Sequence, residues 1–241
     1  MTAGVPRFLS AGRTDTGKVR AHNEDALLQR DDAGLWVVAD GLGGHSAGDY
    51  ASGLIVERLA ALPRPDDVRD FVDAIDATLE RVNHDLRQLA RQRGGDLICS
   101  TVAVLVGHRD LMLCAWVGDS RVYHYSDRRL LRATRDHAHG ADDRGAEIGE
   151  RPGAQPGGGV LTRAVGADDQ LFIDWAIVPG TPDTRFLLCS DGLNKELFDR
   201  EIETVFQADL APEASIERLF EIALARGARD NVSAVVVRHD G

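Results

Sequence analysis

The sequence predicts an α+β domain made of layers of antiparallel sheet and helix. Short apolar segments follow one another in blocks separated by brief turns, which is typical of hairpins, and hairpin strands pair antiparallel. Helical segments also gather in blocks, whereas a doubly wound parallel sheet would alternate them with strands. With 241 residues, 43% of them hydrophobic, the chain can bury one substantial core. We therefore expect a single domain over residues 1–241.

Two helices are expected in the first part of the chain. From residue 68 to residue 89, apolar side chains recur at intervals of three and four with charged residues between them, which predicts one long amphipathic helix. A second helix over residues 47–62 should end before Pro63. The long helix should cover one face of a sheet.

Strands and two shorter helices account for most of the remaining chain. Apolar or β-branched runs that end in Gly or in hairpin residues predict buried strands. The expected strands lie within residues 35–41, 101–106, 111–117, 122–125, 185–192 and 230–237, and the late helices within residues 202–206 and 216–224.

Three carboxylates lie at the ends of these predicted strands. Asp40 and Asp191 each follow an apolar run and precede a glycine, and Asp230 opens the last run. Strands that end at one edge of an antiparallel sheet neighbour strands that begin there, so these acids can meet in one coordination sphere. Oxygen ligands suit Mg²⁺ or Mn²⁺. A lone Asp-Gly pair favours a tight turn, but the recurrence of acids beside apolar layers favours a bound cation.

Charge and cysteine content restrict the class of protein. The 39 acidic and 28 basic residues give a net charge of -11, which would repel a nucleic-acid backbone. A substrate that carries phosphate would need a metal or a well-placed arginine. Cys99, Cys114 and Cys189 lie in or beside apolar runs and lack zinc-site spacing, so they indicate a reducing compartment. Without a membrane-spanning run or a secretion signal, we expect a cytoplasmic protein that does not insert into membranes.

Residues 137–159 differ in composition from the rest of the chain. This segment is rich in glycine and holds almost no large apolar residue, so it contributes little to a core. We expect a mobile loop there, and long loops within compact domains are often functional.

Seven short motifs follow one another along the chain. They are RAHNED at residues 20–25, DGLGGH at 40–45, GDSR at 118–121, TRDH at 134–137, LTRAVG at 161–166, SDGL at 190–193 and RDNVS at 229–233. In this order they resemble the motif series of the bacterial metal-dependent Ser/Thr protein phosphatases of type 2C. The resemblance covers the chain from about residue 10 to its end. It implies a four-layer sandwich, two stacked antiparallel sheets flanked by helices, with the metals at one edge.

The resemblance also implies a set of metal ligands. Asp40 corresponds to a carboxylate that bridges two Mn²⁺ or Mg²⁺ ions, with the Gly41 carbonyl on one of them. Asp191 and Asp230 correspond to the acids that hold the other ion. Asp119, together with Asp191, corresponds to the site of a third and weaker ion. Judged as a turn residue alone, Asp119 also suits a hairpin.

Further residues are assigned around the metals by the same resemblance. Arg20 corresponds to the residue that grips the substrate phosphate, and Glu24 and Asp25 to residues that hold metal-bound waters. Asn231 should support the site. Two simpler interpretations remain open: Arg20 as a surface cation paired with Glu24 at helical spacing, and the Glu24–Asp25 pair as the start of a helix or turn.

Two departures from the family pattern concern proton donation and the flap. Many eukaryotic members carry a His general acid after the first Asp-Gly pair, where this chain has Leu42, which cannot donate a proton. His45 is the remaining candidate for the general acid. The Gly-rich segment occupies the place of the flap beside the active site, at about residues 137–160, without the amphipathic pattern usual there.

The function implied is that of a phosphoserine/phosphothreonine protein phosphatase in which a metal-bridging water attacks phosphorus directly. Its partners would be phosphorylated Ser/Thr proteins, namely a Ser/Thr kinase and its targets, and the resemblance extends to members that act in type VI secretion control. A monomer is expected. Two alternatives are a non-catalytic phosphoprotein-binding module on the same scaffold and a metal-dependent phosphodiesterase.

Overall fold

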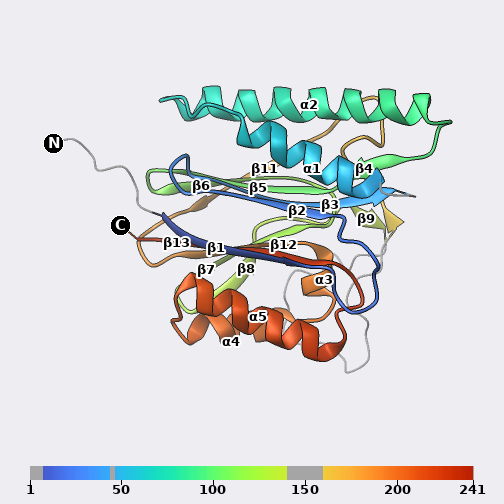
Figure 1. Ribbon diagram of the computed structural model, residues 1–241. Helices are drawn as coiled ribbons and strands as arrows, with labels where there is room; N and C mark the ends of the chain where they lie inside the picture. Colours follow the sequence, from blue (N-terminus) through green and yellow to red (C-terminus); the bar gives the residue numbers. More distant parts are fainter. Residues whose placement is uncertain (1–7, 44–46, 140–159, 241) are drawn as a thin grey trace.

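The computed structural model describes residues 8–43, 47–139 and 160–240. Two antiparallel sheets lie face to face, with helices on both outer faces (Figure 1). This is the α+β four-layer sandwich that the sequence predicted. Most of the expected flap segment, residues 140–159, and the candidate acid His45 lie outside the described residues, as do residues 1–7 and 241.

One sheet has six strands, five of which lie side by side in one continuous order while the sixth pairs with the end of β3. Its order is β11–β6–β5–β3–β2, and β4 pairs with β3 beyond the end of β5. The strands are β2 (Asp25–Arg30), β3 (Leu35–Gly43), β4 (Ile98–Ser100), β5 (Val102–His108), β6 (Leu111–Val117) and β11 (Asp174–Pro179).

The other sheet has five strands in the order β1–β13–β12–β7–β8. These strands are β1 (Phe8–Asp15), β7 (Arg121–Ser126), β8 (Arg129–Arg132), β12 (Arg185–Cys189) and β13 (Val232–His239). A short separate pair, β9 (Ala138–His139) with β10 (Val160–Leu161), joins the two described ends of the Gly-rich segment.

The predicted helices are confirmed, with slightly different ends. Helices α1 (Ala47–Ala60) and α2 (Val68–Gln92) cover the six-stranded sheet, and α4 (Asp199–Gln207) and α5 (Pro212–Arg226) cover the five-stranded sheet (Figure 1). A single turn, α3 (Asp191–Asn194), directly follows β12. Helix α2 begins where the side chain of Asp67 accepts a hydrogen bond from the backbone N–H of Arg69, a standard N-cap.

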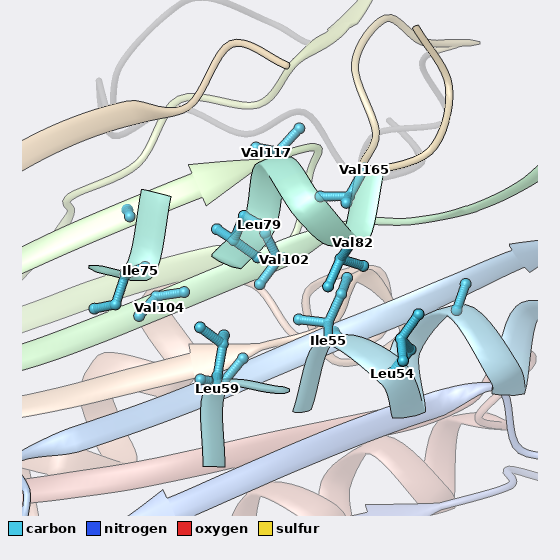
Figure 2. Close-up of a cluster of buried hydrophobic side chains, with 14 of the residues drawn as sticks. Leu54, Ile55, Leu59, Ile75, Leu79, Val82, Val102, Val104, Val117 and Val165 are labelled. Carbon is cyan, nitrogen blue, oxygen red and sulfur yellow. The ribbon is translucent and has the colours of Figure 1, made fainter. Parts of the chain in front are cut away.

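Three apolar layers hold the sandwich together. Helices α1 and α2 pack on the first sheet through side chains such as Ile55, Leu79 and Val104 (Figure 2). The strand period of two gives β3 two apolar faces: Val37 faces these helices, while Trp36 faces the core between the sheets. A third cluster fills the space between the five-stranded sheet and α4 and α5. The three cysteines are free and buried, as predicted.

The strand ends differ from the sequence-based expectation in a way that matters for the site. Asp40 lies inside β3, which continues to Gly43, and Asp191 begins α3 instead of ending a strand. Asp230 precedes β13 by two residues. Asp40 belongs to the six-stranded sheet, whereas β12 and β13 are neighbours in the other sheet. The expectation that one sheet edge supplies all three acids is therefore wrong, and both layers contribute.

Candidate functional site

A serine hydroxyl connects the two sheets at the end of the sandwich where β2 begins and β12 ends. In the pairing of β2 with β3, Asp25 lies opposite Asp40. The Ser190 hydroxyl, from the other sheet, donates a hydrogen bond of 2.8 Å to Oδ2 of Asp25 and accepts one of 3.0 Å from the Ser233 N–H. Ser190 was not among the predicted site residues, although it lies in the SDGL motif directly before Asp191. The bond fixes the acids of one sheet relative to those of the other.

Glycines allow the backbone segments of the site to approach each other closely. The Gly41 N–H donates to the Glu24 carbonyl at 3.0 Å. A Cβ on Gly41 would lie 2.0 Å from the carbonyl oxygen of Gly48 in α1. A Cβ on Gly192 would similarly lie 1.9 Å from the Asn231 carbonyl oxygen. The glycines that follow Asp40 and Asp191 are therefore required by close packing of the backbone, independently of any role of their carbonyl groups.

The Asn231 side chain holds the loop that carries Arg20 and Glu24. Its Oδ1 accepts a 2.9 Å hydrogen bond from the Glu24 N–H, and its Nδ2 donates to the carbonyls of Thr16 and His22, each at 2.9 Å. One side chain thus ties the start of β13 to three points of the loop between β1 and β2.

The electrostatics of the cluster centre on Asp40. Burial first, and then the charges of Asp25, Asp191, Asp119 and Asp230, raise its pKa well above the usual value. Burial is likewise the main reason that the pKa of Asp25 rises to about 6 and that of Asp119 to about 6. Five carboxylates therefore influence one another across both sheets, and each would be easier to ionise with a cation nearby.

Two basic side chains contact these acids within the described part of the chain. The Arg20 guanidinium binds the Asp230 carboxylate through two nitrogens. Its Nε lies 2.9 Å from Oδ1, and its Nη2 donates to Oδ2 at 3.0 Å. Lys195 forms an ion pair with Asp191 and lies 3.6 Å from Oδ2 of Asp230. The alternative pairing of Arg20 with Glu24 on a helix is not observed, because residues 16–24 form turns and loop. Asp25 begins a strand, not a helix.

Asp119 lies in the turn between β6 and β7 and also beside the acid cluster. Gly118 adopts a φ of +113°, and Asp191 is among the charges that raise the pKa of Asp119. The turn is held by His137, whose Nδ1 accepts from the Gly118 N–H at 3.1 Å and whose backbone N–H donates to the Gly118 carbonyl at 2.9 Å. Both interpretations of Asp119, as turn residue and as ligand, agree with this placement.

Two further arginines of the motifs, Arg121 and Arg163, form ion pairs away from the acid cluster. Arg121 binds Asp136 through several hydrogen bonds, the shortest at 2.7 Å, and Arg163 pairs with Asp174 at 3.1 Å. Leu42 is 39% exposed and carries no proton to donate.

The donor chemistry of the cluster fits a divalent cation. The Oδ1 atoms of Asp25 and Asp191 are buried and lack a hydrogen-bond partner, which is costly for a carboxylate. All the candidate ligands are oxygens, the type that Mg²⁺ and Mn²⁺ prefer. The acids are not arranged as a complete set of metal ligands. Across residues 8–43, 47–139 and 160–240, no group of three His, Cys, Asp or Glu side chains is placed to hold a metal ion. Lys195 and Arg20 are the cations in contact with Asp191 and Asp230.

Comparison with known proteins places the whole chain in a family. The sequence profile described as "Protein phosphatase 2C" matches residues 16–236. The serine/threonine phosphatase Stp of Listeria monocytogenes serotype 4b is 29% identical over 242 residues, covering 95% of this chain and 94% of its own. The serine/threonine protein phosphatase PstP of Mycobacterium tuberculosis is 32% identical, covering 94% of this chain and 44% of PstP.

Solved structures share the whole fold. PppA, described as a key regulatory component of the type VI secretion system in Pseudomonas aeruginosa, superimposes with a TM-score of 0.87 at 39% identity, covering 98% of this chain and 99% of PppA. The catalytic domain of PstP, described as a complex with two manganese ions, gives a TM-score of 0.82 at 27% identity, covering 97% of this chain and 99% of that chain.

The family match and these relatives, together with the shared two-sheet sandwich, place the chain in the class of metal-dependent protein phosphatases. The chain belongs to the bacterial branch of the protein phosphatase 2C family, and it is an enzyme of the serine/threonine phosphatase class. Among the helices in the described residues, none combines the length and apolarity needed to cross a membrane.

Proposed function

We propose that this enzyme hydrolyses phosphoserine and phosphothreonine monoesters on proteins with the help of two Mn²⁺ or Mg²⁺ ions. The proposal rests on the half-buried cluster of acids drawn from both sheets, in which Asp25 and Asp191 each have a buried carboxylate oxygen without a hydrogen-bond partner. Such a cluster is difficult to keep ionised without a cation.

Asp40, the Gly41 carbonyl, Asp191 and Asp230 would hold the two ions. Asp119, with Asp191, would take a third and weaker ion, since affinity for hard cations rises with the number of charged ligands and this ion would have only two. When bound, the ions would lower the pKa of a water for direct attack on phosphorus and offset charge on the phosphoryl oxygens.

The other residues of the site position groups and recognise phosphate. Asp25 and Glu24 would accept hydrogen bonds from water at the site, and Asn231 would fix the loop that carries Glu24. Arg20 is 54% exposed at its side chain. Its guanidinium can therefore exchange Asp230 for a substrate phosphate, which it would bind through two parallel hydrogen bonds. His45 remains the candidate donor of a proton to the leaving serine or threonine oxygen.

The substrates would be phosphorylated Ser/Thr proteins, because the curated relatives are serine/threonine phosphatases. The similarity to PppA supports a role in type VI secretion control, in which the enzyme reverses the action of a Ser/Thr kinase. We further propose that it works in the cytoplasm as a monomer with one catalytic domain.

A comparison of substrates tests the reaction class. Phosphate release from a phosphothreonine peptide in Mn²⁺ should greatly exceed cleavage of bis-(p-nitrophenyl) phosphate. Preference for the diester would support the phosphodiesterase alternative, which the net charge of -11 disfavours only for nucleic-acid substrates. Tight binding of the phosphopeptide without turnover at any Mn²⁺ concentration would support the non-catalytic module.

A further inference from the structure

One basic side chain within the acid cluster has no part in the function proposed above. Of the 28 basic residues in the chain, only Lys18 and Lys195 are lysines. Lys195 is the C-cap of α3, and its backbone N–H donates to the Asp191 carbonyl at 2.8 Å. This helical turn places Asp191 and Lys195 at i and i+4, so their side chains lie on the same face.

The ammonium group of Lys195 contacts acids from two separate elements. Its Nζ pairs with Oδ2 of Asp191, at the start of α3, and lies 3.6 Å from Oδ2 of Asp230, just before β13. Arg20 binds the Asp230 carboxylate as well, but it makes no ion pair with Asp191 in the described part of the chain. Lys195 is therefore the cation that links the two acids proposed to share a metal.

We propose that Lys195 is an internal counter-ion that occupies the place of a divalent cation between Asp191 and Asp230 and must be displaced when metal binds. This inference rests on the proposed function, because it assumes that these two acids are metal ligands.

Two physical arguments support the exchange. Half-buried carboxylates that lie close together without a counter-ion repel one another and destabilise the fold, so the ammonium of Lys195 should stabilise the metal-free protein. Lysine is a compact charge on a flexible stem, and the Lys195 side chain is 32% exposed, so it can move toward solvent without disturbing the core. A group that binds only the metal-free form lowers the apparent metal affinity by mass action. Lys195 would thus set the metal concentration at which the site fills.

Removal of the Lys195 charge tests whether this side chain competes with metal, and removal of the Lys18 charge is the matched control. Lys195→Met keeps the length of the side chain, and Lys18→Met removes the same charge from an exposed position. We expect calorimetry to show Mn²⁺ binding about tenfold tighter in Lys195→Met, as fits the strong dependence of cation affinity on site charge. In EDTA, the same variant should unfold at a lower temperature than wild type. Lys18→Met should match wild type in both measurements, and Lys195→Arg should stay close to wild type in Mn²⁺ affinity.

Unchanged or weaker Mn²⁺ binding by a folded Lys195→Met variant would overturn the inference. If that variant does not fold, NMR on the wild-type protein still tests whether metal displaces Lys195. Selective ¹³Cε labelling of lysine gives signals from only two side chains, and diamagnetic Mg²⁺ should shift the Lys195 signal while leaving that of Lys18 in place. A Lys195 signal that does not respond at saturating Mg²⁺ would exclude displacement.

Metal binding and phosphate release by wild type separate the counter-ion role of Lys195 from the catalytic function. Wild type that binds Mn²⁺ and releases phosphate from a phosphothreonine peptide, while Lys195→Met binds Mn²⁺ with equal affinity, would refute the counter-ion and leave the function intact. Wild type that binds no metal would refute both.

Discussion

At the residue scale, Asp40 is the side chain whose charge is most opposed by its surroundings. Its burial, and then four neighbouring acids, raise its pKa. Asp40→Asn keeps the shape and removes the charge, so it should have opposite effects on two quantities. Thermal unfolding in EDTA should occur at the same or a higher temperature, because one repelling charge is gone. Mn²⁺ affinity should fall by at least about tenfold, because Asp40 is the ligand that we propose the two ions share.

Asp76 offers a matched control for Asp40. It is a partly buried acid with a raised pKa, but it lies on α2 and accepts a 3.0 Å hydrogen bond from Trp175. Asp76→Asn should leave Mn²⁺ affinity unchanged. Equal loss of Mn²⁺ binding in both variants, or wild-type binding by Asp40→Asn, would contradict the role of Asp40.

At the scale of elements, the approach of β3 to α1 depends on glycine. A Cβ at Gly41 would collide with the Gly48 carbonyl, whereas a Cβ at Gly53, inside α1, meets no atom within 4 Å. Gly41→Ala should therefore destabilise the protein by about 1–3 kcal/mol, as overpacking does. Gly53→Ala should stabilise it by about 0.5–1 kcal/mol, because alanine is the better helix residue. Denaturant unfolding of both variants would show effects of opposite sign, and destabilisation of equal size by both would argue against the close packing of β3 on α1.

His137 connects the Asp119 turn to β11 and should make stability depend on pH. Its Nδ1 accepts from the Gly118 N–H, so the neutral ring carries its proton on Nε2, 3.0 Å from Asp174. Burial lowers the His137 pKa below its ordinary 6.5, and Arg163 adds to this, while Asp174 and Asp136 act in the opposite direction. The unfolded chain therefore takes up the proton first as pH falls.

This order of protonation determines how the free energy of unfolding changes with pH. Stability due to neutral His137 is complete above about pH 6.5 and is lost as pH falls from there through the folded pKa. Between about pH 7 and about pH 5, the unfolding temperature of wild type should fall more steeply than that of His137→Gln. Parallel curves for the two proteins would show that His137 does not titrate between folded and unfolded states.

The elements were predictable to the extent that local periodicity determines them. Helix α2 repeats its apolar positions over 25 residues, and β3 and β12 are continuous apolar runs, so their existence follows from the sequence. Where a strand ends was less predictable. β3 continues past Asp40 because Gly41 and Gly43 pair with β4, a contact between segments far apart in the chain.

At the scale of the whole molecule, the meeting of the acids depends on how the two sheets stack. The sequence identifies Asp40, Asp191 and Asp230 as candidates by their position beside apolar runs. It does not reveal that the Ser190 hydroxyl spans the sheets to Asp25, or that Lys195 lies between Asp191 and Asp230, because both contacts arise from tertiary packing. The i,i+4 spacing of Asp191 and Lys195 was the available signal for the second contact.

We propose that the acid cluster binds divalent cations and that the loaded site hydrolyses phosphoserine and phosphothreonine. The most direct measurement is phosphate release from a phosphothreonine peptide by wild type and Asp40→Asn, as Mn²⁺ is titrated into metal-free protein while bound metal is counted. Wild-type turnover should rise from the background rate as two ions bind, whereas Asp40→Asn should neither fill the site nor turn over the peptide in the same Mn²⁺ range. Full turnover in EDTA, or an Asp40→Asn variant as active as wild type, would contradict this proposal.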